Sequence, residues 1–188
     1  MRDPHRVAIL ISGRGSNMRA LVEKARDYEV VLVASNKPAA EGLRWAEERG
    51  IATWAAESKG QTREAFDSQV SAALEKHGIG TVALAGFMRI LSPWFVEQWR
   101  GRMLNIHPSL LPAHRGLDTH RRALEAGDLE HGCTVHFVTT GLDEGPAIAT
   151  ARVPVLPGDT PESLAARVLV EEHRIYPEAL AMVCRGEI

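Results

Sequence analysis

Short apolar runs, separated by amphipathic segments, dominate the pattern of this chain. The runs Val7 to Ile11, Val30 to Ala34 and Thr81 to Phe87 lack the alternation of polar and apolar residues that a half-exposed strand shows. Such runs are typical of parallel strands buried on both faces. We therefore expect an α/β sheet covered by helices on both faces, doubly wound at least in the first half of the chain.

Helical periodicity fills the segments between the runs, and capping signals mark their ends. Gly50 and Gly78 follow two of these segments, and Pro93 and Pro161 open two others. The predicted helices are residues 18–25, 40–49, 62–77, 93–99, 119–126 and 161–185, the last with a kink at Pro177. Further strands are predicted at 51–55, 103–107, 133–138 and 147–155. We see no internal repeat and no linker, so residues 1–188 are expected to form a single domain.

Composition excludes several classes of protein. The 188 residues carry 22 basic and 24 acidic side chains, a net charge of −2, without a basic stripe for a nucleic acid or an anionic membrane. The first apolar run has five residues, too few for a signal peptide or a membrane span. Cys133 and Cys184 do not make a disulfide framework. We expect a soluble, cytoplasmic protein with small-molecule partners.

The first predicted strand leads into a glycine loop, Ser12 to Asn17, and then into a helix. This order points free backbone N–H groups at an anion. A dinucleotide fingerprint would need glycine where Met18 stands, and the lysine of a Walker loop is absent. Two readings stay open: a simple phosphate cradle, in which Ser16 and Asn17 add donors, and a tight turn with a helix cap.

Two polar side chains end the predicted strand 103–107. Side chains alternate along a strand, so Asn105 and His107 should lie on one face and Ile106 on the other, before Pro108 ends the strand. Open α/β sheets place their sites where strands end in this way. The pair alone is equally compatible with an ordinary strand that ends in polar residues.

A later glycine-rich loop, residues 139–146, carries Asp143 and Glu144. A carboxylate beside a histidine fixes its tautomer and favours the protonated ring. An amide and an imidazolium side by side could stabilise the oxyanion of a tetrahedral intermediate. The sequence has no Gly-x-Ser-x-Gly motif, and Cys133 lies within a strand, so the attacking group should come from a substrate. These features favour acyl transfer between two bound molecules.

A metal site is not expected. His131, Cys133 and His136 are close in sequence, but on an extended strand Cys133 and His136 face opposite sides. His136 is better interpreted as a residue that packs beside a site. The remaining histidines, among them His114 and His120, form no pattern that predicts a function.

Several long strings in one order resemble the phosphoribosylglycinamide formyltransferases, folate-dependent enzymes of purine synthesis. The resemblance extends from Val7 to Pro177. It is carried by residues 11–13, 15–17, 84–93, 105–112, 131–132, 135–138, 172–173 and 175–177. It implies a three-layer α/β/α fold with a mostly parallel, mixed seven-stranded sheet. It also implies a phosphate-binding half (about 1–100) and a catalytic, folate-binding half (about 80–188).

The resemblance further implies the reaction and the residues that perform it. The formyl group of 10-formyltetrahydrofolate, a co-substrate, would pass to the amine of glycinamide ribonucleotide, giving formylglycinamide ribonucleotide and tetrahydrofolate without a metal. Asn105 and protonated His107 would stabilise the oxyanion, and His107 would also act as proton donor. Asp143 would favour the protonated ring and relay protons through water. Implied ribonucleotide contacts are Gly15, Ser16, Asn17, Gly86, Ile106, Pro108 and Glu172. Implied folate contacts are Arg63, Met88, Arg89, Ile90, Leu91, Val96, Met103, Asn105, Val138, Thr139, Thr140, Gly141 and Asp143.

Two departures and three alternatives accompany this resemblance. Residues 113–116 read Ala-His-Arg-Gly, and the Arg-Gly pair resembles the sequence at this point in methionyl-tRNA formyltransferase. Leu169 stands at a position where relatives often have a polar residue. The tRNA enzyme has an additional C-terminal domain, and formyltetrahydrofolate deformylase has an additional N-terminal domain. We expect neither additional domain in this chain. A non-catalytic nucleotide-binding module would leave Asn105, His107 and Asp143 without a shared purpose. The sequence leaves monomer and homodimer open.

Overall fold

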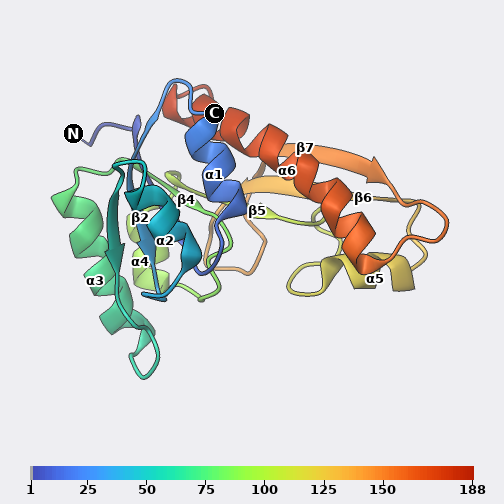
Figure 1. Ribbon diagram of the computed structural model, residues 1–188, viewed down its shortest axis with the longest axis horizontal. Coiled ribbons are helices and arrows are strands. Elements are labelled where there is room, and N and C mark those ends of the chain that lie inside the picture. The colour runs from blue at the N-terminus through green and yellow to red at the C-terminus, as the bar shows by residue number, and fades with distance from the viewer. Residues whose placement is uncertain (1) are drawn as a thin grey trace.

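The structure, a computed structural model, describes residues 2–188. Its strands are β1 (Arg6–Ile11), β2 (Glu29–Ser35), β3 (Ala52–Ala55), β4 (Thr81–Leu84), β5 (Met103–His107), β6 (Glu130–Phe137) and β7 (Ala147–Pro154). Its helices are α1 (Ser16–Glu23), α2 (Glu41–Glu47), α3 (Arg63–Lys76), α4 (Pro93–Gln98), α5 (Thr119–Glu125) and α6 (Pro161–Cys184). All the strands belong to one sheet (Figure 1).

The sheet has the order β3-β2-β1-β4-β5-β6-β7. Strands β1 to β5 are parallel to one another, whereas β6 runs antiparallel to both β5 and β7. The predicted mixed, mostly parallel sheet of seven strands is thus confirmed. Because the chain winds outward from β1 to β3 and then returns to β4 on the other side, the order reverses between β1 and β4. Ligands of open α/β sheets bind outside the carboxyl ends of the strands at such a reversal.

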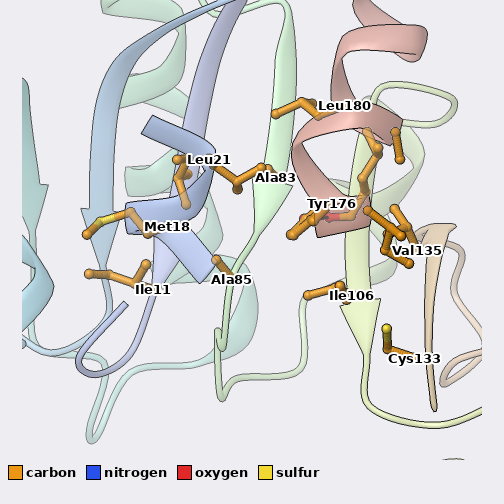
Figure 2. Close-up of a cluster of buried hydrophobic side chains, with 14 of the residues drawn as sticks. Ile11, Met18, Leu21, Ala83, Ala85, Ile106, Cys133, Val135, Tyr176 and Leu180 are labelled. Atoms are coloured by element: carbon orange, nitrogen blue, oxygen red, sulfur yellow. Dashed lines mark hydrogen bonds between the residues drawn. The ribbon is translucent and has the colours of Figure 1, made fainter. Parts of the chain in front are cut away.

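Alternate residues of β1 supply the two hydrophobic cores. Val7, Ile9 and Ile11 pack in the core that α1, α2, α5 and α6 cover, part of which Figure 2 shows. Ala8 and Leu10 pack in the other core, beneath α3 and α4. The sheet is therefore the middle of three layers, as the apolar runs predicted.

The buried hydroxyl of Tyr176 ties α6 to the centre of the sheet. It donates to the carbonyl of Leu84 at 2.8 Å and lies 3.2 Å from that of Leu104. Pro177 is the next residue, and α6 continues through it to Cys184. The kink expected there stays a prediction.

Two strand boundaries differ by three residues from the predicted ones. Strand β4 ends at Leu84, and not at Phe87, because Gly86 has a φ of 70° and turns the chain. The backbone N–H of Met88 then donates to Ser12 Oγ at 2.7 Å, which fastens this turn to the loop after β1. Strand β6 begins at Glu130, three residues before the expected Cys133, because antiparallel pairing with β7 continues to that point.

Between residues 2 and 188, none of the helices combines the length and the apolar character that crossing a membrane requires.

Candidate active site

The two faces of β5 divide its side chains between the core and the site. Ile106 packs in the core with Val135 and Tyr176 (Figure 2). Asn105 and His107 point to the opposite face and lie opposite His136 and Thr134 of β6 in the antiparallel register. The predicted alternation along β5 is confirmed.

The same register separates the three residues that were weighed as metal ligands. Cys133 is buried in the core beneath α6, while His136 is on the face of Asn105. Burial raises the pKa of the Cys133 thiol to about 12, so it stays protonated. Within residues 2–188, no group of three or more His, Cys, Asp or Glu side chains is arranged to hold a metal ion.

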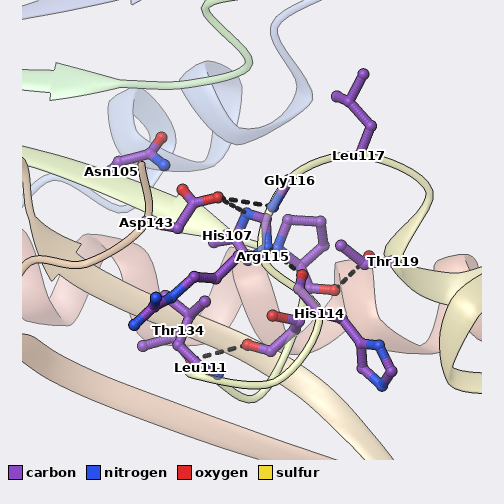
Figure 3. Close-up of polar contacts among 12 residues, drawn as sticks. Asn105, His107, Leu111, His114, Arg115, Gly116, Leu117, Thr119, Thr134 and Asp143 are labelled. Atoms are coloured by element: carbon purple, nitrogen blue, oxygen red, sulfur yellow. Dashed lines mark hydrogen bonds and ion pairs between the residues drawn. The ribbon is translucent and has the colours of Figure 1, made fainter. Parts of the chain in front are cut away.

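Both ring nitrogens of His107 face acceptors (Figure 3). Nε2 lies 2.9 Å from the carbonyl oxygen of His114, and Nδ1 lies 3.4 Å from Asp143 Oδ2. A carbonyl oxygen only accepts, so Nε2 carries a proton, and Nδ1 is the nitrogen that faces the carboxylate. The side chain is 8% exposed, so these two acceptors are its main partners. Only the doubly protonated ring has an N–H group for each of them.

Asp143 is fixed by the loop opposite its own. The backbone N–H of Gly116 donates to its Oδ2 at 3.0 Å, and its Oδ1 lies 3.8 Å from His136 Nε2. Its backbone is left-handed, with a φ of 51°, a conformation that Asp adopts more readily than most residues. Arg115 and Glu144 form a second, exposed link between the two loops at 3.2 Å. The carboxylate is therefore held against His107 from two directions.

Asn105 is oriented by His136, a residue that sequence reasoning placed beside the site without a role. His136 Nδ1 donates to the carbonyl of Phe137 at 2.9 Å, which leaves Nε2 to accept from Asn105 Nδ2 at 3.3 Å. Burial lowers the pKa of His136, which keeps this ring neutral and able to accept. An amide carries two N–H groups, so the second can meet a substrate oxygen. The role of His136 could have been predicted from its position opposite Asn105, but that position is known only once the pairing of β5 with β6 is known.

A cavity of about 310 Å³ lies at the reversal of strand order, between β1 and β4. Its lining is Gly13, Arg14, Gly15, Ser16, Asn17, Ala85, Gly86 and Leu169. Gly15, with a φ of 72°, stands at the N-cap of α1, and a glycine has no side chain to cap the first N–H groups. This favours the phosphate cradle over a turn that merely caps its own helix.

Glu172 reaches the same region from α6. It is 7% exposed, and burial raises the pKa of its carboxyl to about 7, against the opposing effect of a hydrogen bond from Asn17. Two other predicted ribonucleotide contacts have protein partners for some of their atoms, and they stay predictions. Ile106 packs its side chain in the core, and the carbonyl of Pro108 accepts from Thr119 Oγ1 at 2.6 Å.

The predicted folate residues fall into an exposed and a buried group. Met88 and Ile90 are 65% and 59% exposed after the end of β4. Leu91, Val96 and Met103 are buried in the core beneath α3 and α4. Beyond β6, Val138 and Thr139 are partly buried, Thr140 is exposed, and Gly141 precedes Asp143.

The two predicted folate arginines differ in their surroundings. The guanidinium of Arg89 donates to the carbonyls of Ser58, Gln61 and Thr62 at 3.1–3.3 Å, so it fastens the segment before α3. Arg63, the first residue of α3, is exposed. It is the arginine placed to meet a ligand from solvent.

Comparison with known proteins gives one family. Residues 5–180 match the family described as formyl transferase. The phosphoribosylglycinamide formyltransferase of Escherichia coli (strain K12) is 46% identical over 97% of this chain and 88% of that protein. The solved phosphoribosylglycinamide formyltransferase from Brucella melitensis is 50% identical, with a TM-score of 0.90, over 98% of this chain and 97% of that one.

A longer relative is also similar. The trifunctional purine biosynthetic protein adenosine-3 of Drosophila melanogaster is 48% identical over 96% of this chain, which spans 14% of that protein's length. The chain belongs to the formyl transferase family, and within it to the phosphoribosylglycinamide formyltransferases.

Proposed function

We propose that this protein transfers the formyl group of 10-formyltetrahydrofolate to the amine of glycinamide ribonucleotide. The observation that carries the proposal is His107, held between the Asp143 carboxylate and a backbone carbonyl, next to the oriented amide of Asn105. The relatives' names give the substrate class. The cavity at the strand reversal supplies a place for a phosphorylated substrate beside this pair.

Asn105 and His107 perform the electrostatic part of the reaction. The second N–H of Asn105 donates to the formyl oxygen, where negative charge develops as the amine attacks the formyl carbon. His107, protonated on both nitrogens, adds a positive charge beside it. One well-placed donor of this kind is worth about 10²–10³ in rate. Asp143 stabilises the imidazolium. As the bond from the formyl carbon to the folate nitrogen breaks, that nitrogen takes a proton from His107, and the proton lost by the attacking amine returns to His107 through water and Asp143.

The folate supplies the formyl carbon, and the residues around β4 and β6 fit an aromatic ring system. Met88 and Ile90 leave two large apolar side chains exposed close together in the segment after β4, where the ring system of the folate would cover them. The loop 139–146 packs on the end of β6, since a Cβ on Gly145 would collide with the carbonyl of Phe137. We assign the pterin to this region and the folate's glutamate tail to Arg63.

The other elements of the proposal rest on charge and chemistry. The near balance of basic and acidic residues supports small molecules as partners, and neither a nucleic acid nor a membrane. We also assign the protein to the cytoplasm. We retain a single domain over residues 1–188, with the ribonucleotide phosphate in its first half and the folate in its second. The protein would act as a monomer or a homodimer.

The function is tested by offering one formyl donor three acceptors. The protein is mixed with 10-formyltetrahydrofolate and glycinamide ribonucleotide, methionyl-tRNA or buffer, and the release of tetrahydrofolate is followed by absorbance. Release with glycinamide ribonucleotide alone supports the proposal. Release with methionyl-tRNA, or release in buffer, would identify a tRNA formyltransferase or a deformylase instead, and no release in any mixture would favour a binding module.

Replacing Ser16 by alanine should raise the KM for glycinamide ribonucleotide about tenfold. The hydroxyl lies in the glycine-loop cavity, where a hydrogen bond to a charged phosphate is worth roughly 1.5–3 kcal/mol. Steady-state kinetics with each substrate varied in turn would show it, and the KM for the folate should not change. Ser68→Ala, on the exposed side of α3, is the matched control. An unchanged ribonucleotide KM in Ser16→Ala would remove the phosphate from this loop.

Glu172→Gln should stabilise the protein increasingly as the pH rises from 4.5 to about 7. Because burial raises the pKa of Glu172 in the folded state, the unfolded chain releases the proton first, and the native protein loses stability across this window. The gain of the glutamine variant should approach about 3 kcal/mol above it. Urea unfolding at several pH values measures it.

The matched control for this variant is Glu171→Gln. Glu171 is the neighbouring residue on α6, but its carboxylate is partly exposed and pairs with Arg174. A gain from Glu172→Gln that is the same at every pH would show that the carboxyl is not held neutral.

A further inference from the structure

Three histidines outside the proposed catalytic group gather with Asp128 near the 113–118 loop. His114 Nε2 lies 2.6 Å from Asp128 Oδ2, and His120 Nδ1 lies 3.1 Å from His131 Nε2. The ring of His131 stands edge-on to both other rings, with centroids 6.1 Å from His114 and 5.1 Å from His120. The side chain of His114 is therefore enclosed between a carboxylate and a second histidine.

The contact between His114 and Asp128 is the one in this cluster that joins a histidine to a carboxylate. Burial lowers the pKa of His120, and it lowers that of the fully buried His131 to about 4, so both rings are neutral near pH 7. The other charged groups that act on them are His107 and Asp128. Asp128 thus has His114 as its short-range partner, and a donor at 2.6 Å is a strong one.

The backbone of His114 is what meets the catalytic pair. Its φ is 51°, in the left-handed region where a non-glycine residue is held only by its surroundings. In this conformation its carbonyl accepts from His107 Nε2 at 2.9 Å. Two residues further on, the N–H of Gly116 donates to Asp143. One loop therefore determines the orientation of both His107 and Asp143, as Figure 3 shows.

We propose that His114 is a positioning residue for the formyl transfer: its side chain, anchored on Asp128, holds the left-handed backbone that presents the His114 carbonyl to His107. This contact keeps the proton on Nε2 of the neutral His107 ring and turns Nδ1 towards Asp143. His114 itself touches no reacting atom. The effect on turnover rests on the function proposed above, whereas the effect on the His107 tautomer does not.

The consequence for catalysis is specific. If the anchor is lost, Nε2 has no fixed acceptor, so the His107 ring can turn or exchange its tautomer, and Nδ1 is no longer held towards Asp143. Misplacement of a reacting group on the scale of an ångström costs about 10²-fold in rate, and a partial release of the loop should cost about tenfold. Substrate binding residues are on other segments, so KM should be spared.

The test uses His114→Ala, Asp128→Ala and His114→Gln, the last because the amide nitrogen of glutamine reaches about where Nε2 stood. We expect kcat to fall about tenfold in both alanine variants, with little change in either KM, and to recover largely in His114→Gln. His5→Ala, an exposed histidine that bonds to the Asp27 carbonyl far from this loop, is the control. Because the two alanine variants break one contact from its two ends, Asp128→Ala stands in if His114→Ala does not fold.

A second readout is independent of activity. Nitrogen NMR of isotope-labelled histidines, at a pH where His107 is neutral, should show its proton on Nε2 in the parent protein and in His114→Gln, and a mixture of tautomers in the alanine variants. If the tautomer and kcat are both unchanged in Asp128→Ala, or if His114→Gln loses as much as His114→Ala, the positioning role is wrong. If the parent protein transfers no formyl group, the proposed function falls, and the tautomer still decides the role of His114.

Discussion

Replacing His107 by alanine should lower kcat about 10³-fold and leave the fold intact. The side chain lies on the face of β5 opposite Ile106, so its removal leaves the packing of Ile106 unchanged. What is lost is the imidazolium between Asp143 and the His114 carbonyl. General acid catalysis and oxyanion stabilisation each contribute about 10²–10⁴ in rate, and both depend on this ring.

Steady-state kinetics with saturating substrates measures this effect, and thermal unfolding confirms that the variant is folded. His77→Ala is the matched control, because that ring bonds to a backbone carbonyl at the end of α3 and faces no carboxylate of the site. A His107→Ala protein with turnover close to that of the parent would remove His107 from the reaction, whatever its geometry.

Asp143→Asn should lower kcat about 10²-fold with almost no change in stability. Asparagine has the same shape, so its oxygen can still accept from the Gly116 N–H, and it adopts the left-handed backbone readily. The change removes the negative charge beside His107 Nδ1 and His136 Nε2. The imidazolium is then no longer favoured, and the proton has no carboxylate to reach.

The matched control for this variant is Glu144→Gln. It neutralises the adjacent acid of the same loop, whose partner is the exposed Arg115, and surface pairs of this kind contribute about 0–1 kcal/mol. Steady-state kinetics separates the two: kcat should fall about 10²-fold in Asp143→Asn and stay close to that of the parent protein in Glu144→Gln. Equal effects of the two changes would mean that loop charge in general, and not Asp143, matters.

The fold was largely predictable because its strands are buried on both faces. Continuous apolar runs identify such strands without knowledge of their partners. Pro93 and Pro161 open helices as predicted, and the residues before them, Ser92 and Thr160, accept from the first helical turns. The strand end at Leu84 was not predictable in this way. Apolar residues continue beyond it, and it is the positive φ of Gly86, a property of the folded backbone, that ends the pairing.

The positions of site residues were predictable where they depend on the alternation of side chains along one strand. They were not predictable where they depend on which strands pair or on contacts of backbone atoms. Asn105 and His107 share a face because side chains alternate, which one segment alone determines. The role of His136 follows from its register opposite Asn105 across two antiparallel strands. The partner of His107 Nε2 is a carbonyl, and every residue has one, so no residue type could signal that His114 provides it.

The central claim is direct transfer between two bound substrates, with Asn105, His107 and Asp143 as the groups that act on the formyl carbon and its oxygen. Its most direct test follows the formyl carbon itself. The protein is incubated with glycinamide ribonucleotide and 10-formyltetrahydrofolate labelled at that carbon, and the products are separated and identified by mass spectrometry. We predict that all the released label is found on the amine of the ribonucleotide; label released as free formate would contradict the account.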